Sequence, residues 1–189
     1  MNGDILLIIL FAPILLLCVI TIRDLYKWWR LEVDGYHKWW TWIRFVEPEP
    51  GQRNHLAKGR IYKARWCVFR LEDKQTCRFR LPFGMSFLGA IGQISWNEHE
   101  IRVEGRVSRL TLATPGILAA WAAGVSGIIY VRSDHELTPW PLFVLVGGAT
   151  LFTFVFLGGI YLVQGVFERV YFRRAYREIR SRIWQAEQN

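Results

Sequence analysis

Long charge-free stretches dominate the pattern of hydrophobic positions in this sequence. Residues 141–167 contain no Asp, Glu, Lys or Arg, and residues 110–131 are likewise free of formal charge. At about 1.5 Å rise per residue, the longer stretch forms roughly 40 Å of helix, enough to cross a hydrocarbon core of ~30 Å. Residues 5–22 form a third such run, in which Pro13 predicts a kink. The pattern therefore predicts three transmembrane helices.

Apolar residues recur at every second position in a different part of the chain, residues 59–108. Cys77, Phe79 and Leu81 alternate with arginines, and a similar alternation runs through residues 62–68. Because this period is typical of half-buried strands, we expect four short strands in two hairpins, with one apolar and one basic face. About fifty residues make a marginal core, so the apolar face needs cover from the preceding aromatic segment, the C-terminal helix, another subunit or the membrane.

The predicted fold is a membrane α-helical protein with three transmembrane helices and a small cytoplasmic β-rich module, which makes it α+β overall. Pro48, Pro50 and Gly51 define a linker because they disfavour helix and sheet pairing. In chain order the predicted segments are transmembrane helix 1 (1–22), an aromatic and basic interfacial segment (23–46), the linker (47–58), the β-rich module (59–108), transmembrane helix 2 (109–131), an extracytoplasmic loop (132–140), transmembrane helix 3 (141–167) and a basic amphipathic cytoplasmic helix (168–189).

Charge predicts the orientation of these segments. The 189 residues carry a net charge of +8. Of the 24 Lys and Arg residues, 17 lie within 23–109, one is Arg132 and six lie within 169–182. Cytoplasmic segments of membrane proteins carry the excess of Lys and Arg. We therefore expect a multi-pass protein of the cell (inner) membrane, with the N-terminus outside and the C-terminus in the cytoplasm.

Tryptophan and basic residues are concentrated within residues 23–46. Trp28, Trp29 and Arg30 form one cluster, and Trp39 and Trp40 form another. One interpretation is a belt at the membrane interface, where indole rings lie at the headgroup level and cations meet anionic lipid. The other is a docking surface for a protein, because Trp and Arg are enriched at interaction hot spots.

Further candidates for binding lipid or a partner are basic residues of the β-rich module and of the C-terminal helix. They are Arg65, Arg78, Arg80, Arg173, Arg174 and Arg177. The C-terminal helix is amphipathic, and basic amphipathic helices beside membranes bind anionic lipid. Nucleic acid is disfavoured, because the aromatic side chains that would stack on bases, Tyr62 and Trp66, alternate onto the apolar face.

Small residues at helical spacing mark the second predicted span. Gly116, Ala120 and Gly124 recur every four residues. This spacing allows the backbone of a neighbouring helix to approach closely. It predicts helix packing, either within the chain or with another subunit of a homo-oligomer or complex.

An apolar, glycine-rich segment, residues 82–92, connects the two predicted hairpins. It is too short to span a bilayer. A solvent-exposed loop would be more polar, so three interpretations stay open: insertion into the bilayer surface, cover by a partner, or burial under the sheet.

Residues with catalytic or metal-binding potential are few. Glu98, His99 and Glu100 lie together on one predicted turn, and residues 134–136 (Asp-His-Glu) on another, but adjacent ligands on a turn are a weak signal. There is no phosphate loop, dinucleotide fingerprint or nucleophile elbow. The three cysteines, Cys18, Cys67 and Cys77, lack metal-ligand spacing, and in the cytoplasm Cys67 and Cys77 are expected to be reduced thiols. We therefore predict no catalytic residues, no metal and no cofactor.

The function predicted from these features is that of a non-enzymatic accessory or scaffold subunit. Its basic, aromatic module would dock on a membrane protein complex and on anionic lipid. The alternative is a membrane-anchored sensor, in which the β-rich module binds an anionic headgroup or a nucleotide. A third hypothesis is an enzyme at the membrane surface that uses the Glu98, His99 and Glu100 side chains.

Overall fold

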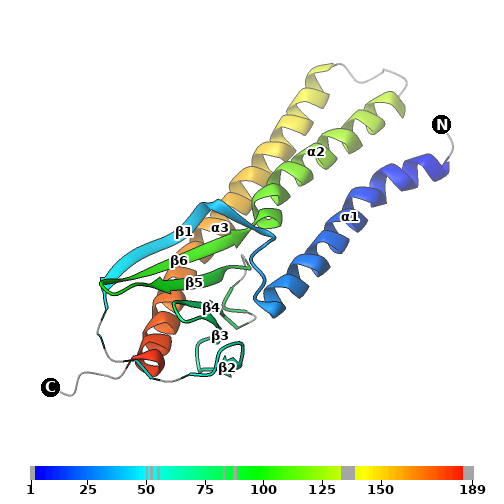
Figure 1. Ribbon diagram of the computed structural model, residues 1–189. Helices are drawn as coiled ribbons and strands as arrows, with labels where there is room; N and C mark the ends of the chain where they lie inside the picture. Colours follow the sequence, from blue (N-terminus) through cyan, green and yellow to red (C-terminus); the bar gives the residue numbers. More distant parts are fainter. Residues whose placement is uncertain are drawn as a thin grey trace. The chain divides into compact units, whose positions relative to one another are not determined.

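The computed structural model describes residues 3–49, 51, 53–54, 56–82, 84–86, 89–132 and 139–184. Within these residues it contains three helices and six strands (Figure 1). In chain order they are α1 (Gly3–Arg30), β1 (Tyr36–Pro48), β2 (Ile61–Lys63), β3 (Val68–Asp73), β4 (Thr76–Arg80), β5 (Ile91–Trp96), β6 (Glu100–Ser108), α2 (Arg109–Arg132) and α3 (Pro139–Ile183).

The chain forms two compact units. The helical unit comprises Met1–Arg23 and Leu110–Val163, and the sheet unit comprises Asp24–Arg109 and Gln164–Asn189. Helices α1 and α3 each contribute residues to both units. All six strands belong to the sheet unit.

The predicted fold, three transmembrane helices with a small β-rich module, is wrong. The β region is a six-stranded antiparallel sheet, and among the described residues only Arg109–Gly127 of α2 is long and apolar enough to cross a membrane. A stretch without charged residues is not by itself a membrane span, because other apolar helices also lack charge. The segment interpreted as an interfacial belt contains β1, because Trp, Ile, Phe and Val favour strands.

The sheet has the strand order β1-β6-β5-β4-β3-β2. Strands β2 to β6 follow one another as antiparallel neighbours, and β3–β4 and β5–β6 are the two hairpins that the alternation predicts. Strand β1 joins at the far side of β6, with Tyr36 opposite Ser108 and Pro48 opposite Glu100. Two irregularities interrupt this pairing around Thr41. Both β1 and β2 are therefore edge strands.

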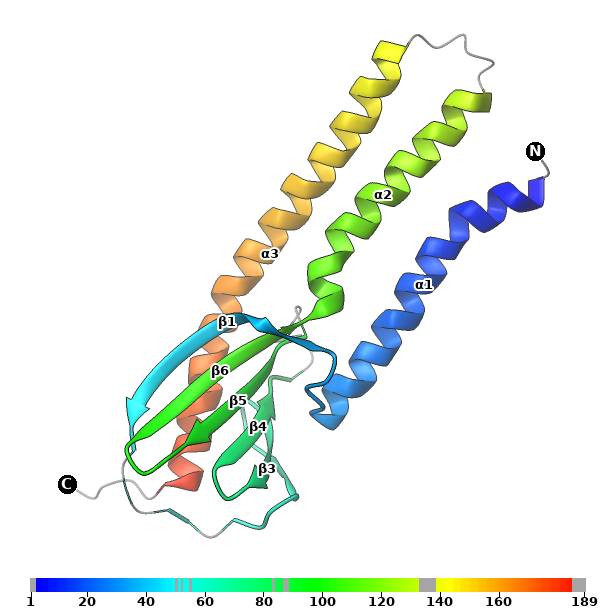
Figure 2. The same cartoon turned by 45° about the horizontal axis from the view of Figure 1, so that its top comes forward.

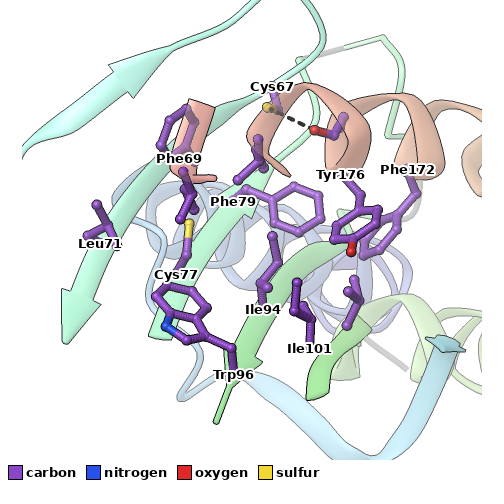
Figure 3. Packing of buried hydrophobic residues seen from close by; sticks show 14 of the residues in the cluster. Cys67, Phe69, Leu71, Cys77, Phe79, Ile94, Trp96, Ile101, Phe172 and Tyr176 are labelled. Atoms are coloured by element: carbon purple, nitrogen blue, oxygen red, sulfur yellow. Dashed lines mark hydrogen bonds between the residues drawn. The ribbon is translucent and has the colours of Figure 1, made fainter. Parts of the chain in front are cut away.

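One face of the sheet, the inner face, packs against the C-terminal part of α3, drawn in orange and red in Figure 2. The helix contributes Phe172, Ala175, Tyr176, Ile179 and Ile183, which are all buried. The alternating strand positions supply the other half of this core (Figure 3), and they include Phe69, Cys77, Phe79, Ile94, Trp96, Ile101 and Val103. Of the covers proposed for the apolar face, the structure selects the C-terminal helix.

Aromatic contacts join the helix to the sheet along its length. The ring centroids of Phe79 and Phe172 lie 4.8 Å apart, and those of Phe45 and Tyr176 lie 5.0 Å apart in an edge-on arrangement. Such pairs add about 0.5–1.5 kcal/mol beyond the area that they bury. The apolar side of this amphipathic helix is thus used inside the protein.

The opposite, outer face is covered at one end by the last turn of α1 and the segment after it. Trp28, Val33 and Tyr36 pack with Ile91 in a second buried cluster. Helix α1 ends because Leu31 adopts the left-handed conformation, with φ of 59°, and is fully buried. The Trp28 indole also donates a hydrogen bond to the Ala90 carbonyl at 3.3 Å.

Two local predictions need correction. The alternation expected through residues 62–68 is interrupted by a turn, in which the Ala64 amide donates to the Cys67 carbonyl, so Cys67 rather than Val68 points to the core. In the segment 82–92, Ile91 and Gly92 begin β5, and Ala90 and Ile91 are buried. Burial is therefore the outcome for that end of the segment, while Phe83, Phe87 and Leu88 lie outside the described residues.

In the helical unit, α2 and the first part of α3 run alongside one another (Figures 1 and 2). Large apolar side chains of this unit are exposed on α1 and α3, and they include Leu15, Leu16, Val19, Leu151, Phe152, Val155, Phe156 and Leu162.

Candidate functional site

Carboxylates compensate most of the arginines on the outer face of the sheet. The Glu72 carboxylate lies 2.7 Å from Arg70 Nη2 and 2.8 Å from Arg78 Nη2, so one acid serves two cations. Arg106 Nη2 lies 3.1 Å from a carboxylate oxygen of Glu104. Arg78, one of the predicted binding residues, is thus engaged within the sheet.

Arg80 lies in the interior of the sheet unit. Its guanidinium carbon is 4.5 Å from the ring centroid of Trp28 and 4.6 Å from that of Trp29. Arg80 is 7% exposed and Trp28 is 2% exposed, and this burial lowers the pKa of the guanidinium. A cation held on two indole faces is a stabilising arrangement. Although the sequence places Trp28 and Arg80 among the binding residues, they lie in the interior, where lipid or a partner does not reach them.

Trp29 and Arg30 remain at the surface. The Trp29 side chain is 60% exposed. Arg30 lies over the Tyr26 ring at 5.2 Å and 3.7 Å from the Glu32 carboxylate. Trp39 and Trp40 lie in β1, where their side chains are outside the described part of the structure. Of the tryptophans predicted to bind, Trp29 is the one that the structure shows to be accessible.

Arg65 and Arg174 both lie beside the Trp66 ring, near the β2 edge of the sheet. Their guanidinium carbons lie 5.3 Å and 5.2 Å from the Trp66 ring centroid. The Glu178 carboxylate accepts hydrogen bonds from the backbone amides of Arg65 and Trp66, at 2.8 Å and 3.0 Å. This arrangement fixes the turn before β3 on α3.

A groove lies between β1 and α3, and we call it the β1–α3 groove. Its volume is about 480 Å³, and it is lined by Ile43, Arg44, Phe45, Val166, Arg169, Val170 and Arg173. Three of the lining residues are arginines and the others are apolar. The groove thus combines positive charge with hydrophobic surface, and all its residues belong to the sheet unit.

The structure therefore separates the predicted cations of α3. Arg173 lines the β1–α3 groove, and Arg174 faces Trp66. Arg177 is exposed on the same helix. Arg44 and Arg169 were missed by the sequence analysis. Arg169 could have been found from its spacing, because it lies one helical turn before Arg173. Arg44 joins them only because its segment forms β1.

A second groove of about 520 Å³ lies at the end of the sheet near Trp96. Two of its cations are paired, because Arg53 lies 2.6 Å from Glu49 and Lys58 lies 2.8 Å from Asp73, and Lys74 is a further cation of the lining. The Arg53 guanidinium also lies 5.8 Å from the Trp96 ring centroid. Most of the charge at this groove is thus paired within the chain.

Asp24, Tyr36 and Ser108 form a polar cluster where β1 and β6 meet the end of α1, in which Tyr36 and Ser108 are buried. Ser108 Oγ and Asp24 Oδ2 are hydrogen-bonded. Burial raises the pKa of Asp24, although the Ser108 hydrogen bond and the Lys27 ammonium oppose the shift. Burial and then the Asp24 charge raise the pKa of Tyr36.

The residues considered for catalysis or metal binding lie in exposed or undescribed positions. In the turn that holds Glu98, the Asn97 side chain accepts hydrogen bonds from the amides of His99 and Glu100. The Glu100 carboxylate pairs with Arg102 at 2.9 Å. Residues 134–136 lie outside the described residues. Where the structure is described, it holds no group of three His, Cys, Asp or Glu side chains suited to a metal.

The two cysteines of the sheet unit are core residues. Cys67 and Cys77 are fully buried. Burial, with the nearby Glu178 carboxylate, raises the pKa of Cys67 to about 12, and burial likewise raises the pKa of Cys77. Neither thiol is ionised at neutral pH, so neither is a nucleophile there.

Gly116, Ala120 and Gly124 of α2, predicted to pack on another helix, face open space. A Cβ at Gly116 or Gly124 meets none of the described atoms within 4 Å. Ala120 is also exposed. Close packing at these positions is thus not provided by the described part of this chain.

Comparisons with protein-family models, curated proteins and solved structures found no match to this chain.

Proposed function

We propose that this protein is a membrane-associated accessory subunit that docks on a membrane protein complex and on anionic lipid, without catalytic activity of its own. The observation that carries the proposal is the exposure of large apolar side chains on the helical unit. Leu151, Phe152 and Val155 of α3 and Leu15 and Leu16 of α1 are each more than half exposed. Contact with lipid or with a membrane-embedded protein would remove this surface from water.

Two further observations support the proposal. Helix α2 contains the stretch Arg109–Gly127, which is long and apolar enough to cross a membrane. Trp29 and Arg30 are exposed together at the end of α1, and both are residue types enriched at interaction hot spots. A location in the cell membrane, with the N-terminus outside, stays a prediction from the distribution of basic residues.

Fractionation of cells that produce the full chain tests the membrane association. We expect the protein in the membrane pellet, resistant to high salt and released by detergent, because apolar burial is not screened by salt. Recovery in the soluble fraction would overturn the proposal.

Docking on a partner is tested separately by purification in mild detergent. A stoichiometric protein companion is expected, and its recovery should fall about tenfold when Trp29→Ala and Arg30→Gln are combined. Ile61→Ala is the control, because Ile61 is similarly exposed, at 51%, on the edge strand β2. The alternative function, a sensor, is favoured instead if the chain purifies without a companion and changes conformation when an anionic lipid or a nucleotide is added.

A further inference from the structure

The β1–α3 groove concentrates positive charge. Arg44, Arg169 and Arg173 all line it. The only carboxylate paired with Arg44 among the described residues is Glu104, which is 3.9 Å away and closer to Arg106. No ion pair of Arg173 is found within the described part of the chain. A phosphate accepts paired hydrogen bonds from Arg side chains, so a groove lined by arginines suits a phosphate group.

Apolar surface lies in the same groove. Val166 is 63% exposed and Val170 is 46% exposed, one helical turn apart on α3 beside the two arginines. A small hydrophilic anion would neutralise the arginines and leave both valines in water. A phosphate that carries a hydrocarbon chain would satisfy both parts of the lining.

We propose that the β1–α3 groove is a binding site for an anionic phospholipid. The lipid phosphate lies beside Arg44 and Arg173, and its acyl chain lies over Val166 and Val170. The inference rests on the proposed membrane association, which brings the sheet unit to a source of such lipid. The volume of the β1–α3 groove, about 480 Å³, is in the range of small-molecule sites, roughly 300–1,000 Å³.

The lining disfavours nucleic acid. Among the described lining residues Phe45 is the one aromatic residue, and its ring packs edge-on against Tyr176. It is thus committed to the core, where it offers no face for base stacking.

The test uses the full chain purified in detergent and native mass spectrometry, with added phosphatidylglycerol or phosphatidylcholine as defined probes. We expect about tenfold more retained phosphatidylglycerol than phosphatidylcholine, since only the former has a net negative charge for the arginines. The double variant Arg44→Gln/Arg173→Gln should lose this preference. Arg174→Gln/Arg177→Gln removes the same charge from residues outside the groove and should keep it. Thermal unfolding of each variant verifies that the sheet unit is folded.

Three outcomes would overturn the proposal. They are equal loss of preference in both double variants, no loss in either, and displacement of the retained lipid by inorganic phosphate alone. Equal loss in both double variants would indicate diffuse charge attraction. Displacement by inorganic phosphate would indicate that the groove is a site for a free anion. Fractionation separates this inference from the proposed function, because the Arg44→Gln/Arg173→Gln variant should still sediment with membranes. If the wild-type chain does not sediment, the proposed function fails regardless of the lipid preference.

Discussion

The Phe79 ring lies directly over Gly92 and fills the space that a Cβ at position 92 would occupy. The two residues are paired between β4 and β5, and Gly92 is in turn paired with Gly105 of β6. Above Gly105 lies the Phe172 ring of α3, 3.1 Å from the position of a Cβ. Two neighbouring glycines thus make room for two aromatic rings between the sheet and the helix.

Gly92→Ala should therefore destabilise the sheet unit strongly. Its added methyl group meets the Phe79 ring, and overpacking of this kind costs about 1–3 kcal/mol or more. Gly105→Ala should cost less, because a small shift of the Phe172 ring accommodates its methyl group. Chemical denaturation of the full chain in detergent, followed by tryptophan fluorescence, measures both. Phe79→Leu should lower the free energy of unfolding less in the Gly92→Ala background than in the wild type. If the effects of the two substitutions are strictly additive, the contact between the Phe79 ring and position 92 is contradicted.

Glu178 is expected to stabilise the turn between β2 and β3. Its two carboxylate oxygens accept the Arg65 and Trp66 amides, at 2.8 Å and 3.0 Å. Glu178→Ala leaves both donors without this acceptor, at a cost of about 1–3 kcal/mol in the free energy of unfolding. Glu178→Gln keeps one acceptor oxygen and should cost less. Glu98→Ala, at an exposed turn position, is the control and should change stability by less than about 0.5 kcal/mol.

Arg80 should be replaceable by neither Lys nor Gln without loss of stability. Its planar guanidinium lies within 5 Å of the centroids of Trp28 and Trp29, and the lysine ammonium lacks this stacking geometry. We expect Arg80→Lys to cost about 1–2 kcal/mol. A double-mutant cycle with Trp28→Leu measures the coupling, and a coupling energy near zero would show that the two side chains do not stabilise one another.

Stability should fall in alkali. Burial raises the pKa of Cys67 to about 12 and raises the pKa values of Cys77, Tyr36 and Tyr176, the last also because of its hydrogen bond to Glu47. The folded state therefore retains protons that the unfolded chain releases. These contributions are complete below about pH 8.5 for the thiols and about pH 10 for the phenols, and are lost above those values.

Denaturation at several pH values between about 7 and 11 measures this dependence. For each group that keeps its proton in the folded state, the free energy of unfolding falls by about 1.4 kcal/mol per pH unit above the pKa of that group in the unfolded chain. Tyr176→Phe removes one such proton, so its curve should be shallower than that of the wild type above about pH 10. A free energy of unfolding that stays constant across this range would contradict the buried positions of these groups.

The period-two alternation predicted which side chains of β4 face the core, but it did not predict that carboxylates and α1 cover the basic side chains of the other face. Phe79 and Leu81 are buried in the core, and Arg78 lies on the outer face, as the pattern predicts. The strand β1 was missed because its partner, β6, lies about sixty residues further along the chain, and local composition holds no sign of that pairing. Helix α3 was divided into a span and a separate helix, since its character changes from apolar to basic near Glu168.

The candidate site was predictable only in part. Arg173 and Arg174 were both identified as exposed cations of an amphipathic helix, but helix periodicity does not tell which neighbour each one faces. Arg44 became a member of the groove through the long-range pairing of β1. Arg80 illustrates the reverse error, because an arginine between two tryptophans of another element is buried, whereas its sequence neighbours suggest an exposed basic face.

Because α3 is divided between the two units, the sheet unit is built from two stretches of the chain that are separated in sequence. The strands end at Ser108, yet the helix that covers their apolar face begins its contribution at Gln164, after the whole of Leu110–Val163. The helical segment is therefore an insertion within the sheet unit. During synthesis the six strands are therefore translated before the end of α3, so Phe79 and its neighbours on the apolar face have no helix to cover them until α3 is translated. No contiguous fragment of the gene encodes the sheet unit alone, and expressing it separately requires a designed bridge from Arg109 to Gln164.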